Sequence, residues 1–439
     1  MRKSSRLVSV VFPHLALVYG LLALPTIGQG ASLNVRNWIP PNSFVPPTTL
    51  ESLNGDGLLV SGSKASGTIP MWLCLAASSP SAQCNTTYSF AMVGKNPTVN
   101  GSGATTIDTK IVPIRFTSAS LTFDAENNDS CSPRRTPALN MVQQSPVFRS
   151  VTLPWNKSVG TAQFVSLFQR ANFWTYAQPK GASPNYQVTL NQVLVNAVEN
   201  KTPIAIINPA TSPSLTALPY TINGVVQTDT TWCDPLAMID VNELDTLLRT
   251  QIIPVLKGNS VTPTTLPIFL LSNVVMYDSK VDPSPQGLGC CILGYHNAYL
   301  SLTTGATAGK IQTYIVANYD STGGANFPGA FPTAPDIVAL ANMVAGWMDN
   351  PTTLNTTPPW RGTINGVPGP QTTLEVAYPD ALMSQPLTPI TTPNKTVYHV
   401  QDLAFKSWFY CDTGSNNAGF NGQYALLNIP PFPPNPLCP

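Results

Sequence analysis

The sequence predicts an α+β domain over residues 90–412, because strand-like runs alternate there with segments of helical periodicity. Only 10% of the 439 residues are charged, and 44 are proline. An average soluble domain has about 25% charged residues and about half this share of proline. Apolar residues make up 43% of the chain. The composition therefore indicates a sizeable core under a rigid, loop-rich and β-leaning exterior.

Four runs rich in branched and aromatic residues are predicted to form strands of this domain. They cover residues 109–116, 204–207, 268–277 and 311–319. Helix candidates lie between these runs, so an α/β arrangement is the alternative to α+β at this point.

Three segments are predicted to be helices. In residues 162–174, one face carries Phe164, Leu167, Phe168 and Ala171. A second helix begins at Asp240, because Asp240 and Glu243 have the spacing of a capping box, and its apolar stripe continues to Pro254. A third begins at residues 333–336, with a cap candidate, a proline and an early acid, and runs to Pro351.

The two ends of the chain have compositions of their own. Residues 1–30 read as a signal peptide, because three basic residues precede an apolar run and small residues follow it. An uncleaved membrane anchor is the alternative. Residues 31–89 predict a small β-rich region, and residues 413–439 a proline-rich tail pinned by Cys438. We therefore expect an extracellular or periplasmic protein with no membrane span after signal removal.

The charge balance excludes one class of partner. The formal net charge is +1, and no basic block occurs along the chain. Nucleic-acid binding proteins gather Lys and Arg on a patch or stripe. A nucleic-acid partner is therefore not expected.

Eight cysteines follow the signal segment and indicate an oxidising compartment. Cys74 and Cys84 flank a turn-rich insert, and we predict that they form a local disulfide. The adjacent Cys290 and Cys291 are expected to serve different partners, or one partner and one buried thiol, rather than to bridge each other. No paired CxxC units occur, which excludes a zinc ribbon.

Candidate catalytic residues are few. Only His296 and His399 remain after signal removal, and each is expected to be structural. Residues 412–415 read Asp-Thr-Gly-Ser, but an aspartic protease needs two aspartates and no second such motif occurs, so we expect a capped turn. No GxSxG motif is present.

Several blocks of the chain together resemble one known group. They include GCCILGYHNAY, IQTYIVANYDSTGG, the predicted third helix with its continuation to TTPPW, LEVAYPDAL and VYHVQDLAFKSWF, with YSFAMVG, TTIDTKIVPI and FQRANFW upstream. This chain resembles secreted bacterial zincin-like proteins, metallopeptidase-like proteins of largely uncharacterised function, over about residues 90–410. In that group the helix carries His-Glu-x-x-Glu followed by Asp-Pro, and a later Glu-Val-Gly-Asp block forms a second part of the site. The resemblance implies a zincin-like mixed domain and a zinc-dependent peptidase site.

The chain departs from that pattern at the positions that carry the chemistry. On the helix, Asn342, Met343 and Gly346 replace the His and the two Glu, and Asn350 precedes the proline. In the later block Glu375 is kept, and Tyr378 stands at the Asp position. The resemblance thus predicts a pseudoenzyme with no cofactor, no metal and no catalytic residue, and with a binding or structural role toward an extracellular ligand.

Two other functions stay open. The first is an active secreted peptidase or other hydrolase, with His296 and Glu375 as a candidate alternative site and zinc as the cofactor. The second is a surface adhesion module, in which the proline-rich ends and the N-terminal β-rich region do the binding.

Overall fold

The computed structural model describes fifteen stretches of the chain, all within one compact unit, Ser32–Pro439. They are residues 68–74, 88–97, 103–118, 121–127, 136–177, 186–192, 237–256, 261–283, 289–301, 310–321, 335–364, 367–379, 387–411, 424–427 and 431–438. The predicted signal peptide, the predicted strand 204–207, Cys84 and the motif at 412–415 lie outside these residues. None of the described helices is long and apolar enough to cross a membrane.

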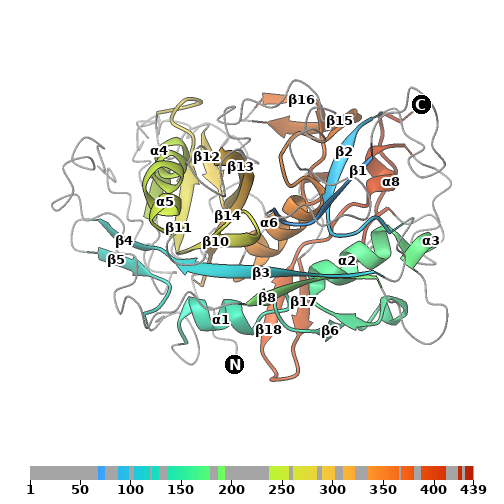
Figure 1. Cartoon of the computed structure of the whole chain (residues 1–439), viewed down its shortest axis with the longest axis horizontal. Coiled ribbons are helices and arrows are strands. Elements are labelled where there is room, and N and C mark those ends of the chain that lie inside the picture. Colours follow the sequence, from blue (N-terminus) through green and yellow to red (C-terminus); the bar gives the residue numbers. More distant parts are fainter. Residues whose placement is uncertain are drawn as a thin grey trace, which may run out of the picture. The chain divides into compact units, whose positions relative to one another are not determined.

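A five-stranded sheet organises the molecule (Figure 1), with the strand order β13-β14-β10-β3-β8. These strands are β13 (Gly294–Ser301), β14 (Lys310–Tyr319), β10 (Thr265–Ser272), β3 (Ala104–Pro113) and β8 (Gln187–Gln192). Four of them run parallel, and only the edge strand β13 runs antiparallel to its neighbour β14. Every residue of β10 is buried, as expected for a parallel strand covered on both faces.

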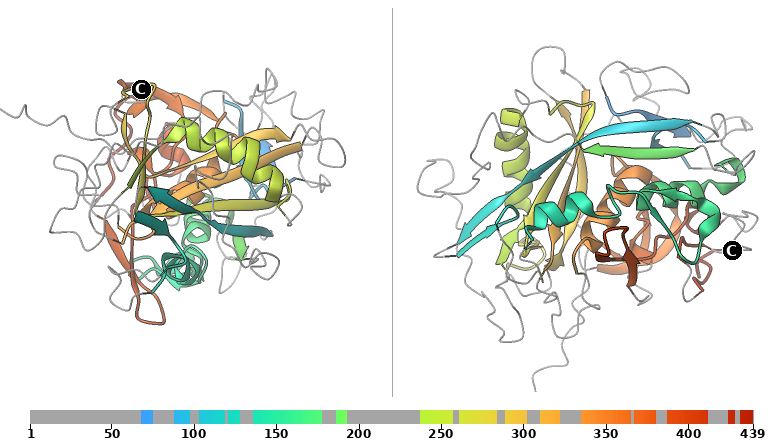
Figure 2. Two further views of the ribbon diagram at one scale, coloured as in Figure 1. Left: turned by 90° about the vertical axis from the view of Figure 1, so that its left-hand side faces the viewer. Right: turned by 90° about the horizontal axis from the view of Figure 1, so that it is seen from below.

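The pleat of the sheet divides its side chains between two cores. Phe269 of β10 and Tyr314 of β14 point into the core on the side of α4 (Val241–Leu247) and α5 (Ile253–Leu256). Ile268 and Ile315, one position along each strand, point into the larger core under α2 (Phe164–Asn172) and α6 (Val338–Asp349). Figure 2 shows α4 and α5 on one side of the sheet and α6 on the other. The fold is therefore mixed α+β.

The described helices are short. They are α1 (Ala138–Gln144), α2 (Phe164–Asn172), α3 (Trp174–Ala177), α4 (Val241–Leu247), α5 (Ile253–Leu256), α6 (Val338–Asp349) and α8 (Lys406–Phe409), with a 3-10 turn at Lys157–Val159 and a π-helical turn at Leu248–Ile252 between α4 and α5. All three predicted helices are confirmed. The predicted cap is also present, because the Asp240 carboxylate accepts hydrogen bonds from the N–H groups of Asn242 and Glu243.

Two predicted boundaries need correction. The third helix begins at Val338 rather than at residues 333–336, because Asp336 has a φ of 47° and forms a β-bridge with Asp320. The run 268–277 is two strands, because Asn273 has a φ of 55° and separates β10 from β11 (Val274–Tyr277). The predicted strand 311–319 is confirmed as β14, and the run 109–116 covers the end of β3 and the start of β4 (Arg115–Ser118).

Smaller sheets surround the central one. The sheet β12-β11-β9 contains β12 (Cys290–Ile292) and β9 (Ala237–Asp240). The remaining strands form two-stranded antiparallel sheets, in which β4 pairs with β5 (Leu121–Asp124), β6 (Val151–Thr152) with β7 (Thr161–Ala162), β15 (Thr356–Ile364) with β16 (Val367–Thr373), β17 (Thr388–Thr391) with β18 (Val397–Val400), and β1 (Met71–Cys74) with β2 (Phe90–Val93). The β1–β2 pair spans the boundary predicted between residues 89 and 90, and both strands contribute to the larger core.

The disulfides correct one expectation and agree with another. Cys290 and Cys291 are bridged to each other, so the expectation that they serve different partners is wrong. Both lie in a small apolar cluster between β9, β11 and α6, to which no other described cysteine contributes. Cys411 and Cys438 are also bridged, which pins the tail at Cys438 as predicted. Cys74 is buried and disulfide-bonded, but Cys84 lies outside the described residues, so their pairing stays a prediction.

Candidate functional site

The helix α6 lies on the sheet so that its middle faces the edge strand β13. It packs against β13 and β14, on the side of the larger core. In β13, His296 pairs in register with Ile315, and the side chain of His296 points toward α6. Asn342 and Gly346 are four residues apart on α6 and therefore lie on one helix face. This packing brings Gly346 next to His296.

His296, Gly346 and Glu375 meet at one point. A Cβ atom on Gly346 would lie 3.2 Å from Nε2 of His296 and 3.7 Å from Oε2 of Glu375. The Nε2 atom of His296 lies 4.0 Å from Oε2 of Glu375, which is too long for a hydrogen bond. Both side chains are buried. Burial lowers the pKa of His296 to about 4, so the imidazole is neutral at pH 7 and the contact is not an ion pair.

Asn342 and Met343 are engaged in packing around this point. The Asn342 amide donates a hydrogen bond of 2.9 Å to Oε1 of Gln401, and Gln401 in turn donates to the carbonyl of Ala377. No hydrogen-bond partner of the buried Oδ1 of Asn342 lies among the described residues. Cγ of Met343 lies 2.7 Å from where a Cβ on Gly294 would be, so a side chain at Gly294 would collide with α6.

Asn350 and Tyr378 have structural contacts of their own. The Asn350 amide donates to the carbonyl of Leu374, and its Oδ1 accepts from the N–H of Asn355. The ring of Tyr378 packs edge-on against Trp360, with 6.0 Å between ring centroids. Of the six positions that the resemblance assigns to the site, Gly346 and Glu375 thus lie together with His296. The other four hold neighbouring segments in place.

The residues at this point do not fit a catalytic zinc ion. Such a site takes three protein ligands, each a histidine, a cysteine or a carboxylate, and leaves a fourth position for water. His296 and Glu375 offer two, and Gly346 offers none. No group of three or more His, Cys, Asp or Glu side chains suited to a metal ion occurs among the residues that the structure describes.

Asp349, the last residue of α6, is a buried carboxyl group that the sequence did not single out. Gln169 and Asn172 of α2 donate to its two oxygens, Asn172 at 3.1 Å. Burial raises the pKa of Asp349 to about 7. Its position gave one weak signal, because an acid is unfavourable at a helix C-terminus.

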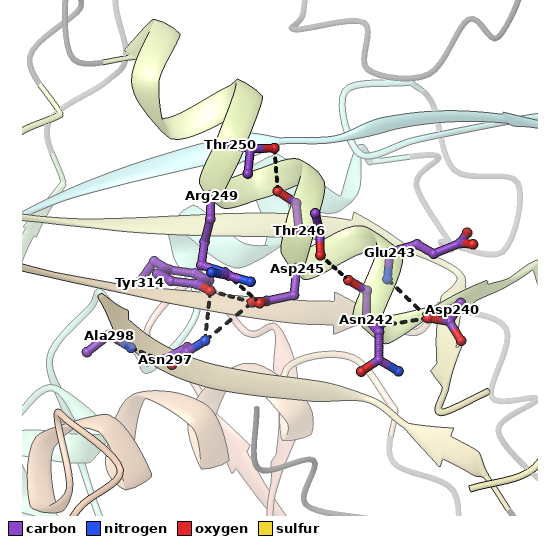
Figure 3. Close-up of polar contacts among 10 residues, drawn as sticks. All are labelled: Asp240, Asn242, Glu243, Asp245, Thr246, Arg249, Thr250, Asn297, Ala298 and Tyr314. Carbon is purple, nitrogen blue, oxygen red and sulfur yellow. Dashed lines mark hydrogen bonds and ion pairs between the residues drawn. The ribbon is translucent and has the colours of Figure 1, made fainter. Parts of the chain in front are cut away.

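A second buried polar cluster lies on the opposite face of the sheet (Figure 3). Asp245 of α4 is paired with Nε of Arg249 at 2.8 Å and accepts the hydroxyl hydrogen bond of Tyr314. The amide of Asn297 on β13 donates to the Tyr314 hydroxyl at 2.9 Å. The Asp245 carboxylate is both ion-paired and hydrogen-bonded. This cluster therefore has a structural role, in which it fastens α4 to the sheet.

The other histidine lies apart from the His296 site. The Nδ1 atom of His399 on β18 lies 2.8 Å from Oδ2 of Asp336, just before α6 begins. This hydrogen bond raises the pKa of His399. The pair joins the β17–β18 hairpin to the start of α6, in agreement with a structural role.

Comparison of the chain with protein-family models, with curated proteins and with solved structures found no match in any of the three. The function must therefore be inferred from the geometry around His296, Gly346 and Glu375.

Proposed function

We propose that this chain is an exported zincin-like protein that has lost zinc binding and catalysis and acts outside the cytoplasm by binding an extracellular ligand or as a structural component. One observation carries the proposal. On α6, the position that resembles the second Glu of His-Glu-x-x-Glu is Gly346, and it faces His296 and Glu375 without contributing a ligand.

The remaining helix positions support the same conclusion. Met343 stands where a zincin has its general base, and a thioether cannot take a proton from water. Asn342 stands where the first ligand would be, and its amide is bonded to Gln401. The helix positions that would carry the zinc site thus make packing and amide contacts instead.

Export is supported by the cysteines as well as by the basic and apolar N-terminal segment. Described cysteines form the bridges Cys290–Cys291 and Cys411–Cys438, and no described cysteine is free. Disulfides persist in oxidising compartments and are rare in the cytosol.

Metal analysis tests this proposal. We expect purified protein to contain well under one zinc per chain, and a chelator to leave its thermal midpoint unchanged. Met343→Glu alone should give no peptidase activity, because a general base without a metal-bound water has nothing to activate. Stoichiometric zinc that is lost in His296→Ala would reject the proposal.

The second candidate is an active zinc hydrolase that uses His296 and Glu375. The 4.0 Å approach of Nε2 to Oε2 favours it, because two potential ligands already face each other. The same measurement separates the two functions, since this candidate requires stoichiometric zinc. The adhesion alternative involves residues 31–67, which lie outside the described residues. Retention of the secreted chain on cells or polysaccharide would favour it.

A further inference from the structure

Asp349 connects three helices at the end of α6. Its two carboxyl oxygens accept from Gln169 and Asn172, which both belong to α2. Oδ1 of Asn172 accepts the backbone N–H of Lys406, the first residue of α8, at 2.9 Å. The carboxyl group of Asp349 therefore links α6 to α2 directly, and to α8 through one amide.

The backbone of Asp349 extends the same junction to β2. The amide of Asn355 donates to the carbonyl of Asp349 and to the carbonyl of Ala91, and its Oδ1 accepts the N–H of Ala91 at 2.8 Å. Asp349 and Asn355 have no exposed surface. A change in the charge of Asp349 therefore acts on a buried, hydrogen-bonded junction.

The two amides of α2 differ in what they can do. Asn172 is held in one orientation, because its Oδ1 already accepts from Lys406. Its NH₂ group therefore faces Asp349 as a donor. The Gln169 amide can present either its N–H or its carbonyl oxygen to Asp349, since rotation by 180° exchanges them. A protonated Asp349 can thus donate to Gln169 while it accepts from Asn172.

Few charges face Asp349. The charge of Lys406 acts on Asp349, and the Nζ of Lys406 lies over the rings of Phe90 and Tyr410 at 4.9 and 5.0 Å. No ion pair between Lys406 and Asp349 is formed in the described part of the chain. The phenols of Tyr186 and Tyr410 also lie within electrostatic range.

The other titratable groups around α6 are directed elsewhere. Arg170 of α2 donates to the carbonyls of Tyr186 and Val159. His296 of β13 lies against Gly346 and Glu375. His399 of β18 bonds Asp336, which also bridges to Asp320 at the end of β14, and β2 itself has no ionisable side chain. Among the described residues, Asp349 therefore forms no ion pair that would compensate its negative charge.

We propose that Asp349 is a proton-operated junction, which holds α2 and α8 tightly against the end of α6 when its carboxyl group is protonated and loosens them when it ionises. This inference goes beyond the proposed function and does not rest on it. The direction follows from burial, because an uncompensated buried carboxylate is less stable than the neutral acid. The raised pKa of Asp349, about 7, places the change near neutral pH.

The test is hydrogen exchange, followed by mass spectrometry, on full-length protein at pH 5.5 and 8.5, with rates corrected for the intrinsic effect of pH. Peptides from α2 and α8 should exchange roughly 30-fold faster at the higher pH. Each pH unit between the ordinary carboxyl pKa and the shifted one favours opening by about tenfold, and about 1.5 such units lie between pH 5.5 and the shifted pKa of about 7. Asp349→Asn keeps a neutral side chain at both values and should remove the difference. His399→Gln is the matched control and should keep it.

Two results would overturn the proposal. One is an unchanged exchange rate between the two pH values in the wild-type protein, and the other is an equal pH effect in Asp349→Asn. If Asp349→Asn does not fold, carboxyl-carbon NMR of the wild-type protein decides. A buried aspartate that titrates near neutral pH supports the junction, and titration of every aspartate below pH 5 rejects it.

Discussion

His296 occupies the space beside Gly346, with Nε2 only 3.2 Å from the position of a Cβ atom on residue 346. Contacts of this length are tighter than nearly all real Cβ contacts, so any side chain at 346 must displace the imidazole. The absence of a side chain at Gly346 and the inward position of His296 therefore depend on each other.

This dependence predicts a coupled response of the two positions. Glycine costs a helix interior about 1 kcal/mol relative to alanine. In a His296→Ala background, Gly346→Ala should therefore stabilise the protein by about 1 kcal/mol. In the wild-type background the same change should be neutral or destabilising, because the ring must move. Chemical denaturation of the four proteins gives the coupling free energy, and equal effects of Gly346→Ala in both backgrounds would contradict it.

The Asp245 cluster predicts a difference between two tyrosines of similar environment. Tyr314→Phe removes the hydroxyl that donates to buried Asp245, and we expect a loss of about 1–3 kcal/mol in the free energy of unfolding. Tyr299 packs against Tyr314, but its buried hydroxyl has no hydrogen-bond partner among the described residues. Tyr299→Phe should therefore be neutral or stabilising, because it removes a buried hydroxyl that has no hydrogen-bond partner among the described residues. Urea unfolding of both variants checks this, and equal losses would contradict the assignment.

The His399–Asp336 hydrogen bond predicts a pH-dependent contribution to stability. The pKa of His399 is raised in the folded state by this bond. The protonated form therefore stabilises the fold fully below the unfolded pKa, and this contribution is lost as the pH rises through the folded pKa. His399 is 38% exposed, so screening by water limits the effect to about 0.5 kcal/mol. His399→Gln should cost more stability at pH 5 than at pH 8.5, and an equal cost at both would contradict this account.

Much of the local structure was predictable because its signals are local. The Asp240 cap and the apolar stripe after it fix α4 through residues that are neighbours in the chain. The sequence pattern predicts the start of α6 too early, because Asp336 bridges Asp320 across the fold and the pattern does not contain that contact. The break between β10 and β11 depends likewise on the left-handed backbone of Asn273.

The site was predictable only in part. The sequence indicates His296 and Glu375 as a candidate pair, and Nε2 of His296 lies 4.0 Å from Oε2 of Glu375. The role of Asp349 depends on Gln169, which is 180 residues away in the sequence, so no local pattern indicated it. General disulfide geometry disfavours a bridge between the adjacent Cys290 and Cys291, and the sequence does not show that both are buried in one apolar cluster.

The C-terminal tail gives the last prediction. Six of the residues 428–439 are proline, so this segment has few backbone N–H groups for strand pairing. Its described part is held by the buried ring of Phe432 against Trp408, by a hydrogen bond from the Trp408 indole to the carbonyl of Pro433, and by the disulfide Cys411–Cys438. The disulfide is the one covalent link among these contacts.

Removal of this bridge should therefore increase the conformational entropy of the unfolded chain and destabilise the fold. The two cysteines are 27 residues apart, and closing such a loop stabilises a fold by about 3–4 kcal/mol on the chain-entropy account. We expect the double variant Cys411→Ser, Cys438→Ser to lose about that much, and limited proteolysis to cut its tail faster than that of the wild-type protein. Cys290→Ala with Cys291→Ala is the control, because a separation of one residue closes no loop of consequence. If the tail of the double variant resists protease as well as the wild-type tail, the contacts at Trp408 alone hold it and the bridge does not.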